Sequence, residues 1–232
     1  MKIRNYLIFS LLFLIILILP TCISNSSCKY ASISEVTTET VVVTGFGPFD
    51  IYDINPSELI IEEINGQYIE GIEIIGIVLP VDFSESVKNV TKAIDEYDPL
   101  LLVSTGLSPK AKKLNVEKIG VNIKMHPKGE KFWFIPRRLE IFGPLFRLST
   151  LNTKEIVRNL NDEGIPSRQS YYAGFYICNA VLYGSLGYIR ENNLSTKVGF
   201  IHVPLLSSQD PNGMDLETMV EGLKLAIKTS LN

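Results

Sequence analysis

Two residues have the chemical type and the sequence surroundings of a nucleophile and its base. Cys178 is the only one of the three cysteines that lies beyond residue 28, and it stands where the irregular stretch 173–177 gives way to a helical pattern. His202, one of two histidines, lies near the end of an apolar, strand-like run that begins at Lys197. A thiol at the start of a helix and an imidazole at the end of a strand are the parts of a cysteine nucleophile with its general base.

Each of these residues also has a structural interpretation. A cysteine within an apolar helix is usually a small buried hydrophobe, and a lone histidine on a strand is more often a satisfied core residue. The location of Cys178 favours catalysis, because Ala173 and Gly174 end the preceding turn and place the thiol at the positive end of a helix dipole, which stabilises a thiolate. The second histidine, His126, has Lys124, Pro127 and Lys128 nearby and is interpreted as a solvated loop residue.

Glu117 lies in the alternating, extended run 114–123 and has two interpretations. It could be a charge at the edge of a sheet that pairs with Lys118. Alternatively, it is the third member of a triad, which orients the imidazole of His202 and stabilises its charged form.

Two phenylalanines, Phe46 and Phe49, lie in a glycine-rich turn that follows the apolar run 41–44. The turn lacks the glycine spacing and the Lys-Ser/Thr pair of a phosphate-binding loop, which argues against nucleotide binding. Two aromatic rings suit a small, flat, apolar ligand instead. The alternative is that both rings belong to the core.

Strand-like and helix-like patterns alternate from Thr40 onward, which predicts an α/β fold with a mostly parallel sheet between layers of helices. In such sheets ligands bind beyond the carboxyl ends of the strands. The turns after the strands should therefore meet at one edge. The expected strands are 41–44, 72–79, 100–105, 114–123, 167–170 and 197–203, and the expected helices begin at Pro56, with Asn55 as cap, and cover 83–97, 153–160, 177–190 and 216–231.

Length and composition limit the other classes of function. The 232 residues suffice for one domain with a sizeable core, and the net charge of −3 gives no indication of a nucleic-acid partner. Three cysteines and two histidines form neither a disulfide framework nor the usual ligand set of a structural zinc site. We therefore expect no metal centre.

The N-terminal segment differs from the rest. Lys2 and Arg4 precede an uncharged apolar run from Tyr6 to Leu19, which indicates that residues 1–23 are a signal peptide or a membrane anchor. Residues 24–38 are rich in Ser and Thr and are interpreted as a tether, so the folded domain is expected over 39–232. The segment 124–145 has no clear period and is interpreted as a long excursion or flap.

Several of these segments together resemble the pyroglutamyl peptidase type I family, the pyrrolidone-carboxylate peptidases. The resemblance covers everything from about Val41 to Asn232. The matching segments are 44–49, 55–57, 79–83, 106–107, 116–122, 149–151, and those around Cys178 and His202, with Gln209 seven residues after His202.

The resemblance implies a Glu-His-Cys triad, formed by match from Glu117, His202 and Cys178, and a pyroglutamyl ring held between Phe46 and Phe49. It further implies a single three-layer α/β/α domain with a twisted, largely parallel sheet, no metal or organic cofactor, and assembly as a homo-tetramer. The expected activity is that of a cysteine exopeptidase that removes N-terminal pyroglutamate (5-oxoproline) from peptides through a thioester acyl-enzyme.

The sequence also departs from the family pattern. Lys110 and Ala111 occupy the places of a usual Gly-Arg pair, and Lys118 replaces an arginine, whose bidentate fork lysine cannot reproduce. The leader predicts secretion or membrane anchoring, whereas the family is usually cytoplasmic. Two alternatives stay open: a related N-terminal amidase with altered ring specificity, and a catalytically weak, anchored binding homologue.

Overall fold

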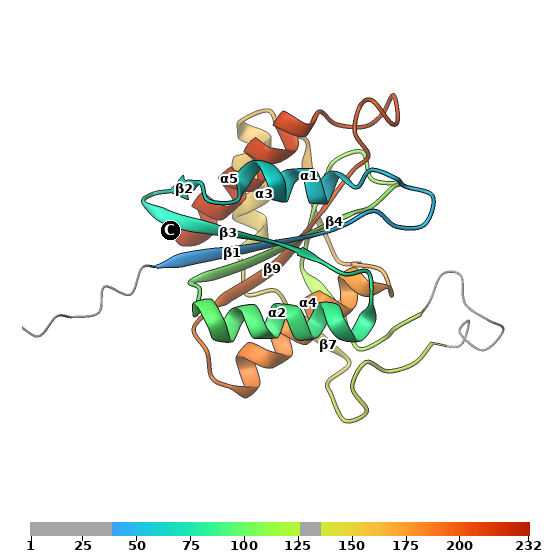
Figure 1. Ribbon diagram of the computed structural model, residues 1–232, viewed down its shortest axis with the longest axis vertical. Coiled ribbons are helices and arrows are strands. Elements are labelled where there is room, and N and C mark those ends of the chain that lie inside the picture. The colour runs from blue at the N-terminus through green and yellow to red at the C-terminus, as the bar shows by residue number, and fades with distance from the viewer. Residues whose placement is uncertain (1–38, 126–135) are drawn as a thin grey trace, which may run out of the picture. The chain divides into compact units, whose positions relative to one another are not determined.

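The computed structural model describes residues 39–125 and 136–232. In that part of the chain, strands and helices alternate and helices cover both faces of a central sheet (Figure 1). The strands are β1 (Thr40–Phe46), β2 (Tyr68–Ile69), β3 (Ile72–Leu79), β4 (Leu101–Leu107), β5 (Leu114–Glu117), β6 (Ile119–Val121), β7 (Phe146–Leu148), β8 (Ser167–Ser170) and β9 (Lys197–Val203). The helices are α1 (Pro56–Ile64), α2 (Phe83–Tyr97), α3 (Thr153–Asp162), α4 (Ile177–Glu191) and α5 (Leu216–Leu231).

The main sheet has the strand order β2-β3-β1-β4-β9-β5-β8. β3, β1, β4 and β9 are parallel, whereas β5 runs antiparallel to β9 and is itself parallel to β8. The expectation of a mostly parallel sheet flanked by helices is confirmed. The reversal at β5 has a consequence for the site, because it brings the beginnings of β5 and β8 to the edge where β1, β4 and β9 end.

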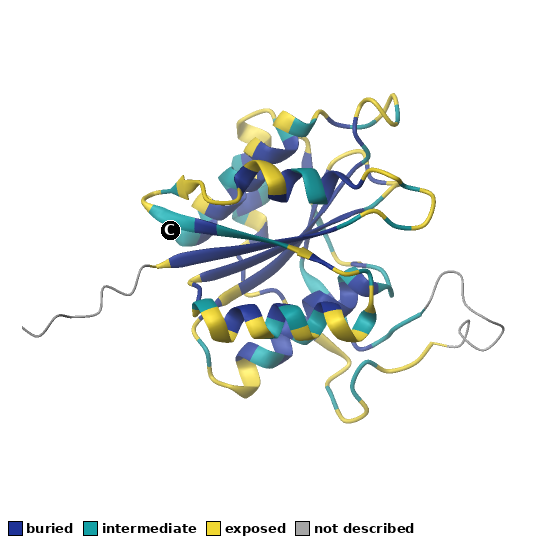
Figure 2. Ribbon diagram, viewed as in Figure 1, coloured by how far each residue is buried: buried dark blue, intermediate teal, exposed yellow. Residues whose placement is uncertain are grey.

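The apolar strands are buried on both faces, as their unbroken hydrophobic runs require. In β1, Val41 and Val43 belong to one core, which the sheet shares with α1, α3 and α5, while Val42 belongs to a second core with α2 and α4. β4 alternates in the same way, with Leu102 in the second core. Figure 2 shows the fully buried strands between the two sets of amphipathic helices.

Local sequence signals define the helix starts. Asn55 caps α1 and accepts a hydrogen bond from the N–H of Ser57 at 3.1 Å, with Pro56 at the first helical position. Asp82 caps α2 through the N–H groups of Ser84 and Glu85, and these bonds lower the pKa of its carboxyl group. Both helices begin immediately after a loop that leaves the carboxyl edge of the sheet.

The expected extended run 114–123 proves to be two strands. The chain leaves the main sheet after Glu117, and β6 then forms a separate two-stranded sheet with β7. Neither β7 nor the short β2 was expected, since three or two residues give too short a pattern to detect. The excursion 124–145 lies partly outside the described residues, but its end is fixed by Arg147, which makes two bonds to Glu140, at 2.6 and 2.7 Å.

The proposed leader, residues 1–23, the tether 24–38 and His126 lie outside the described residues. Within the described ranges, no helix is both long enough and apolar enough to cross a bilayer.

Candidate active site

A cavity of about 430 Å³ opens at the carboxyl edge of the main sheet. The loops that follow β1 and β4 line it, and β9 contributes His202 near its end. The loop after β9 reaches the same edge, where the amide of Gln209 donates to the carbonyl group of Ile54, so the expectation that these turns meet at one edge is confirmed. The cavity is lined by Phe46, Phe49, Asn55, Val81, Leu107, Ser108, Pro109, Lys110, Asn115, Glu117, Arg168, Ser170, Tyr172, Ala173, Gly174, Tyr176, Ile177, Cys178 and His202. All five site residues expected from the sequence are among them.

Cys178 is the second residue of α4 and is partly exposed to the cavity. Gly174 turns the chain into the helix with φ of +80°, a left-handed conformation that favours glycine. Tyr176 at the N-cap provides no side-chain hydrogen bond to the first turn. The N–H groups of that turn and the positive end of the helix dipole are therefore directed at the region of the thiol.

The start of α4 is held in place by Asn179. Its side-chain amide accepts a bond from the N–H of Val121 at 2.8 Å and donates to the carbonyl groups of Val121 and Ile123, both at 2.9 Å. Asn179 is fully buried. The residue next to the thiol thus fixes the first turn of α4 to β6, a role that only the three-dimensional pairing reveals.

His202 is hydrogen-bonded to Glu117, with 2.9 Å between Nδ1 and Oε1. Both side chains are buried, with exposed fractions of 8% and 1%. Lys118 does not pair with Glu117, because its Nζ atom donates to the carbonyl group of Ser149 at 3.2 Å. The structure therefore favours Glu117 as a partner of the imidazole over the alternative of a sheet-edge charge paired with Lys118.

The charge of His202 depends on its neighbours. Burial lowers the pKa of His202, but the negative charge of Cys178, hydrogen bonds to Cys178 and Glu117, and the charge of Glu117 together raise that pKa from 6.5 to about 10. With this pKa the imidazole carries a positive charge at neutral pH, between the sulfur atom of Cys178 and the carboxyl group of Glu117. The Oε2 atom of Glu117 is buried and has no hydrogen-bond partner in the described part of the chain, so the compensating charge for this carboxylate is the imidazolium.

The register of the sheet shows which residues flank His202. His202 on β9 is paired with Gly106 on β4 and with Asn115 on β5, and Asn115 is paired in turn with Arg168 on β8. Gly106, Asn115 and Arg168 were not expected as site residues. The signal that could have found them is the register, which a single sequence does not provide.

The two phenylalanines differ in their surroundings. Phe46 ends β1, is 3% exposed and packs into the core beside α2 and α4. Phe49 is half-buried in the following loop, with its ring centroid 5.7 Å from that of Tyr52. Both rings line the cavity. Phe46 therefore combines the two interpretations, core and ligand contact, whereas Phe49 belongs to the cavity wall.

Two departures from the family pattern can be placed. Lys110 lines the cavity at its exposed rim, and Ala111 is buried beside it. Gln209 lies on the loop after β9, at the same edge of the sheet. Its side-chain amide donates to the carbonyl group of Ile54 and accepts from the N–H of Leu206. The loops after β1 and β9 are thus tied together beside the cavity.

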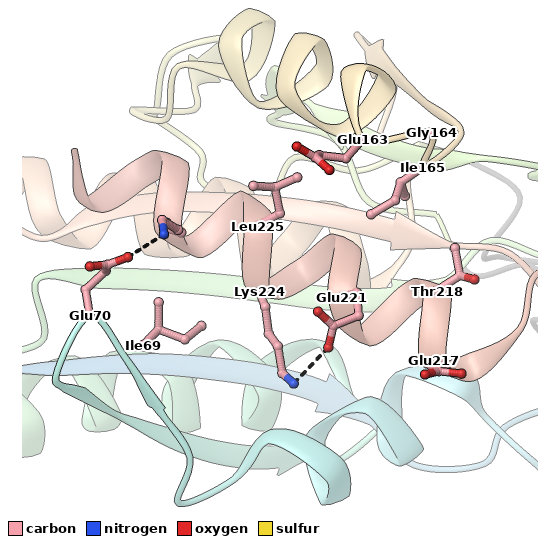
Figure 3. A pocket seen from close by; sticks show the side chains of 11 residues that line it. Ile69, Glu70, Glu163, Gly164, Ile165, Glu217, Thr218, Glu221, Lys224 and Leu225 are labelled. Atoms are coloured by element: carbon pink, nitrogen blue, oxygen red, sulfur yellow. Dashed lines mark hydrogen bonds and ion pairs between the residues drawn. The ribbon is translucent and has the colours of Figure 1, made fainter.

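A second hollow, of about 740 Å³, lies between β2, α3 and α5 (Figure 3). Two of its acidic side chains pair with lysines of α5, Glu221 with Lys224 at 2.9 Å and Glu70 with Lys228 at 2.6 Å. It contains no cysteine or histidine, and no group of residues in the described ranges could hold a metal ion. The cavity that holds Cys178 is therefore the candidate active site.

Known proteins share both the sequence and the fold of this chain. The pyroglutamyl peptidase family (Peptidase_C15) matches residues 39–232. Pyrrolidone-carboxylate peptidase from Coprothermobacter proteolyticus is 32% identical over 198 residues, which cover 81% of this chain and 95% of that protein. A pyrrolidone-carboxylate peptidase 1 from Caldanaerobacter subterraneus is 35% identical over 197 residues, 81% of this chain and 96% of that protein.

Solved structures agree with the sequence comparison. Pyrrolidone carboxyl peptidase from Thermococcus litoralis superimposes with a TM-score of 0.78 at 32% identity, covering 83% of this chain and 93% of that one. Pyroglutamyl peptidase I from Bacillus amyloliquefaciens gives a TM-score of 0.78 at 26% identity, with 83% and 94% covered. With the cysteine, histidine and glutamate gathered in one cavity, this chain belongs to the pyroglutamyl peptidase family.

Proposed function

We propose that the chain is a cysteine peptidase that removes N-terminal pyroglutamate from peptides, with Cys178, His202 and Glu117 as its catalytic residues. The observation that carries the proposal is the buried contact between His202 and Glu117 beside a partly exposed thiol at a helix start. A binding protein would have no need for this arrangement, because a carboxylate and an imidazolium are costly to bury without a role.

Acylation begins when the Cys178 thiolate attacks the carbonyl carbon that links pyroglutamate to the next residue. The carbon–sulfur bond forms, and the electron pair of the carbonyl group moves to its oxygen. The N–H groups in the first turn of α4 can donate to that oxygen. His202, protonated at neutral pH, gives its proton to the leaving amine as the carbon–nitrogen bond breaks, and the released peptide has a free N-terminus.

Deacylation uses the same residues in reverse. The departing proton leaves His202 neutral, so its imidazole can accept a proton from a water molecule that attacks the thioester. The carbon–sulfur bond breaks and pyroglutamic acid leaves. Glu117 holds the Nδ1 side of the ring throughout, which keeps the other nitrogen directed at the thiol and stabilises the imidazolium.

Ring specificity follows from the cavity wall. A five-membered lactam is small and flat, and the rings of Phe46 and Phe49 offer it aromatic contact area. The ring carbonyl group and the neutral amide N–H distinguish it from an N-terminal proline, whose ring has no carbonyl group and a protonated amine. A site that pairs both groups rejects an analogue that lacks one of them by roughly 10⁴–10⁵.

Hydrolysis of a chromogenic pyroglutamyl amide beside its prolyl analogue tests the function. We expect turnover of the pyroglutamyl substrate alone, no turnover by Cys178→Ala, and only traces by Cys178→Ser. Equal cleavage of both substrates would indicate the related amidase with altered ring specificity. Binding of the amide without turnover by the wild-type chain would indicate the binding homologue. Unchanged activity in Cys178→Ala would end the cysteine-peptidase assignment.

We also propose that residues 1–23 direct the enzyme to the membrane or out of the cytoplasm. The support is the sequence pattern of Lys2 and Arg4 before the uncharged run from Tyr6 to Leu19. Fractionation of full-length, C-terminally tagged protein tests this proposal. Recovery entirely in the soluble cytosol, with residues 1–23 still attached, would return the enzyme to the family's usual compartment.

A homo-oligomer is the assembly we propose, with a tetramer as the expected form. Its support is a group of exposed apolar side chains on and before β7: Ile141, Phe142, Leu145, Phe146 and Leu148. A contiguous exposed apolar patch usually marks an interface. Light scattering of the purified chain measures the mass. Phe142 is 99% exposed, so Phe142→Ser should lower the mass without changing the fold, and a monomeric wild-type chain would contradict the proposal.

A further inference from the structure

Two cationic side chains line the catalytic cavity and have no acidic partner within residues 39–125 and 136–232. Lys110 is exposed on the loop after β4, and Arg168 is exposed on β8. Glu117 is the one carboxylate among the residues that line the cavity, and His202 already engages it. The rim of the cavity therefore has positive charge that nothing in the described lining compensates.

The guanidinium group of Arg168 is held in a defined orientation. Its Nε atom donates to Oδ1 of Asn115 at 2.7 Å, and Asn115 is only 6% exposed. Because of this bond, the side chain of Arg168 extends from β8 across β5, in the direction of His202. The two terminal nitrogens of the guanidinium have no partner among the described residues, and together they form the planar fork that binds a carboxylate with two parallel hydrogen bonds.

The order of the strands determines the order in which the residues of the site lie across the sheet. Phe46 lies at the end of β1, Gly106 and the thiol of Cys178 meet at β4, and His202 follows on β9. β5 and β8 complete the row on the far side of the base. Neighbouring strands lie about 4.8 Å apart, so the backbone at Arg168 is roughly 10 Å beyond that at His202.

That order separates the two halves of the substrate. In the proposed reaction the pyroglutamyl ring lies with the phenylalanines on the β1 side of the thiol, and the leaving amine must be close to His202, which protonates it. The first residue after pyroglutamate therefore extends from His202 over β5 toward β8. The long side chain of Arg168 reaches back across the same interval.

We propose that Arg168, oriented by Asn115 and assisted by the charge of Lys110, binds a carboxylate on the first residue of the leaving peptide. Two sources offer this chemistry: the side chain of an aspartate or glutamate that follows pyroglutamate, and the free α-carboxylate of a pyroglutamyl dipeptide. The inference rests on the proposed peptidase activity and adds a substrate class to it. The preferred substrates are acidic on the leaving side.

Matched pairs of substrates test the inference with the full chain. Pyroglutamyl-glutamate amide is compared with pyroglutamyl-glutamine amide, which has the same shape without the charge, and pyroglutamyl-alanine is compared with its amide. We expect kcat/KM to be roughly tenfold higher for at least one acid than for its neutral counterpart, as a charge-assisted hydrogen bond would give. The pair that shows the advantage identifies the source of the carboxylate. Added salt should reduce the advantage.

Variants then assign the preference to Arg168. Arg168→Gln should abolish most of the advantage, measured as the ratio of kcat/KM for each acid to that for its neutral counterpart. Arg168→Lys should retain only part of it, because lysine lacks the fork, and Lys110→Gln should lower it less than Arg168→Gln does. Lys92→Gln on α2, exposed and remote from the cavity, is the control for the change in net charge and should leave the ratio unchanged.

The outcomes separate the two proposals. Cleavage of the neutral amides without any preference for the acids would overturn the role of Arg168 and leave the peptidase function intact. A preference that persists in Arg168→Gln would also overturn it. Failure to cleave any of the four substrates would refute the proposed function, and this inference with it.

Discussion

The sulfur atom of Cys178 lies 2.9 Å from the position that a Cβ atom on Gly106 would occupy. The ring of Phe200 lies 3.0 Å and that of Phe46 3.4 Å from the same position. The contact with sulfur is too short for an unchanged packing and the contact with Phe200 is tight, whereas 3.4 Å to Phe46 is an ordinary van der Waals distance. The absent side chain at the end of β4 is therefore what lets the nucleophile, at the start of α4, reach the sheet edge beside His202.

This relationship predicts the effect of Gly106→Ala. The added methyl group should displace Sγ away from the imidazole, and a misplacement of about 1 Å can lower the rate on the order of 10²-fold. kcat should therefore fall much more than KM rises. Gly47→Ala is the matched control on the neighbouring loop, because its Cβ would meet nothing closer than Glu58, at 3.6 Å. Similar activity in both variants would show that Gly106 does not position the thiol.

Glu117→Gln tests the carboxylate as a partner of His202. An amide keeps the shape of the side chain but removes the charge that stabilises the imidazolium. In a serine-protease triad the comparable change lowers kcat on the order of 10⁴-fold. We expect Glu117→Gln to lower kcat strongly as well, with little change in KM. Glu62→Gln, on the exposed surface of α1, is the control. A loss of less than about threefold would assign Glu117 a structural role.

Phe46 and Phe49 should respond differently to truncation. Phe46 is buried in the core, so Phe46→Ala should lower the free energy of unfolding by about 3–5 kcal/mol and reduce activity as well. Phe49 is half-buried, so Phe49→Ala should keep the melting temperature and lower kcat/KM by roughly tenfold. Tyr68→Ala, an exposed aromatic on β2, should change neither quantity.

Thermal melting and steady-state kinetics on these three variants decide between the two interpretations of the rings. If Phe49→Ala lowers the melting temperature by several degrees and keeps kcat/KM, its ring is part of the core. The sequence suggested one shared role for both phenylalanines. The structure separates them, because β1 ends at Phe46 and the ring at that position faces the second core.

Much of the fold could be predicted from local patterns. The apolar runs of β1 and β4 and the capping residue Asn55 are signals within a few residues of each element. The reversal of β5 could not be predicted in this way, since strand direction depends on pairing with β9, far along the chain. That reversal places Asn115 and Arg168 at the cavity, which explains why the sequence pointed to Cys178 and His202 but not to these two residues.

The triad itself illustrates the same limit. Cys178 and His202 carry local signals, a helix start and a strand end, whereas the role of Glu117 rests on a single contact across 85 positions of sequence. From the sequence alone, Lys118 was an equally good partner for this carboxylate. Only the placement of Lys118 beside Ser149 removes that alternative.

The raised pKa of His202 predicts how the site titrates. In the wild-type chain the imidazole should stay protonated until the pH approaches about 10. Cys178→Ala removes the sulfur, whose charge is the first of the influences that raise the pKa of His202, while burial still lowers that pKa. The pKa of His202 should therefore fall in the variant. Proton NMR of the imidazole C–H groups measures both values, and His126→Gln identifies the resonance of His202.

The raised pKa of His202 also determines how the stability of the fold changes with pH. A folded-state pKa above the unfolded value of 6.5 means that the charged imidazole stabilises the fold fully below about pH 6.5, and that this contribution is lost as the pH rises through about 10. In Cys178→Ala the loss should be complete at a lower pH, because the folded-state pKa is lower. Denaturant unfolding from pH 6 to pH 10 measures the difference. Identical pKa values for His202 in the two proteins would mean that the thiolate does not interact with the imidazolium, and the ion pair on which the mechanism depends would not exist.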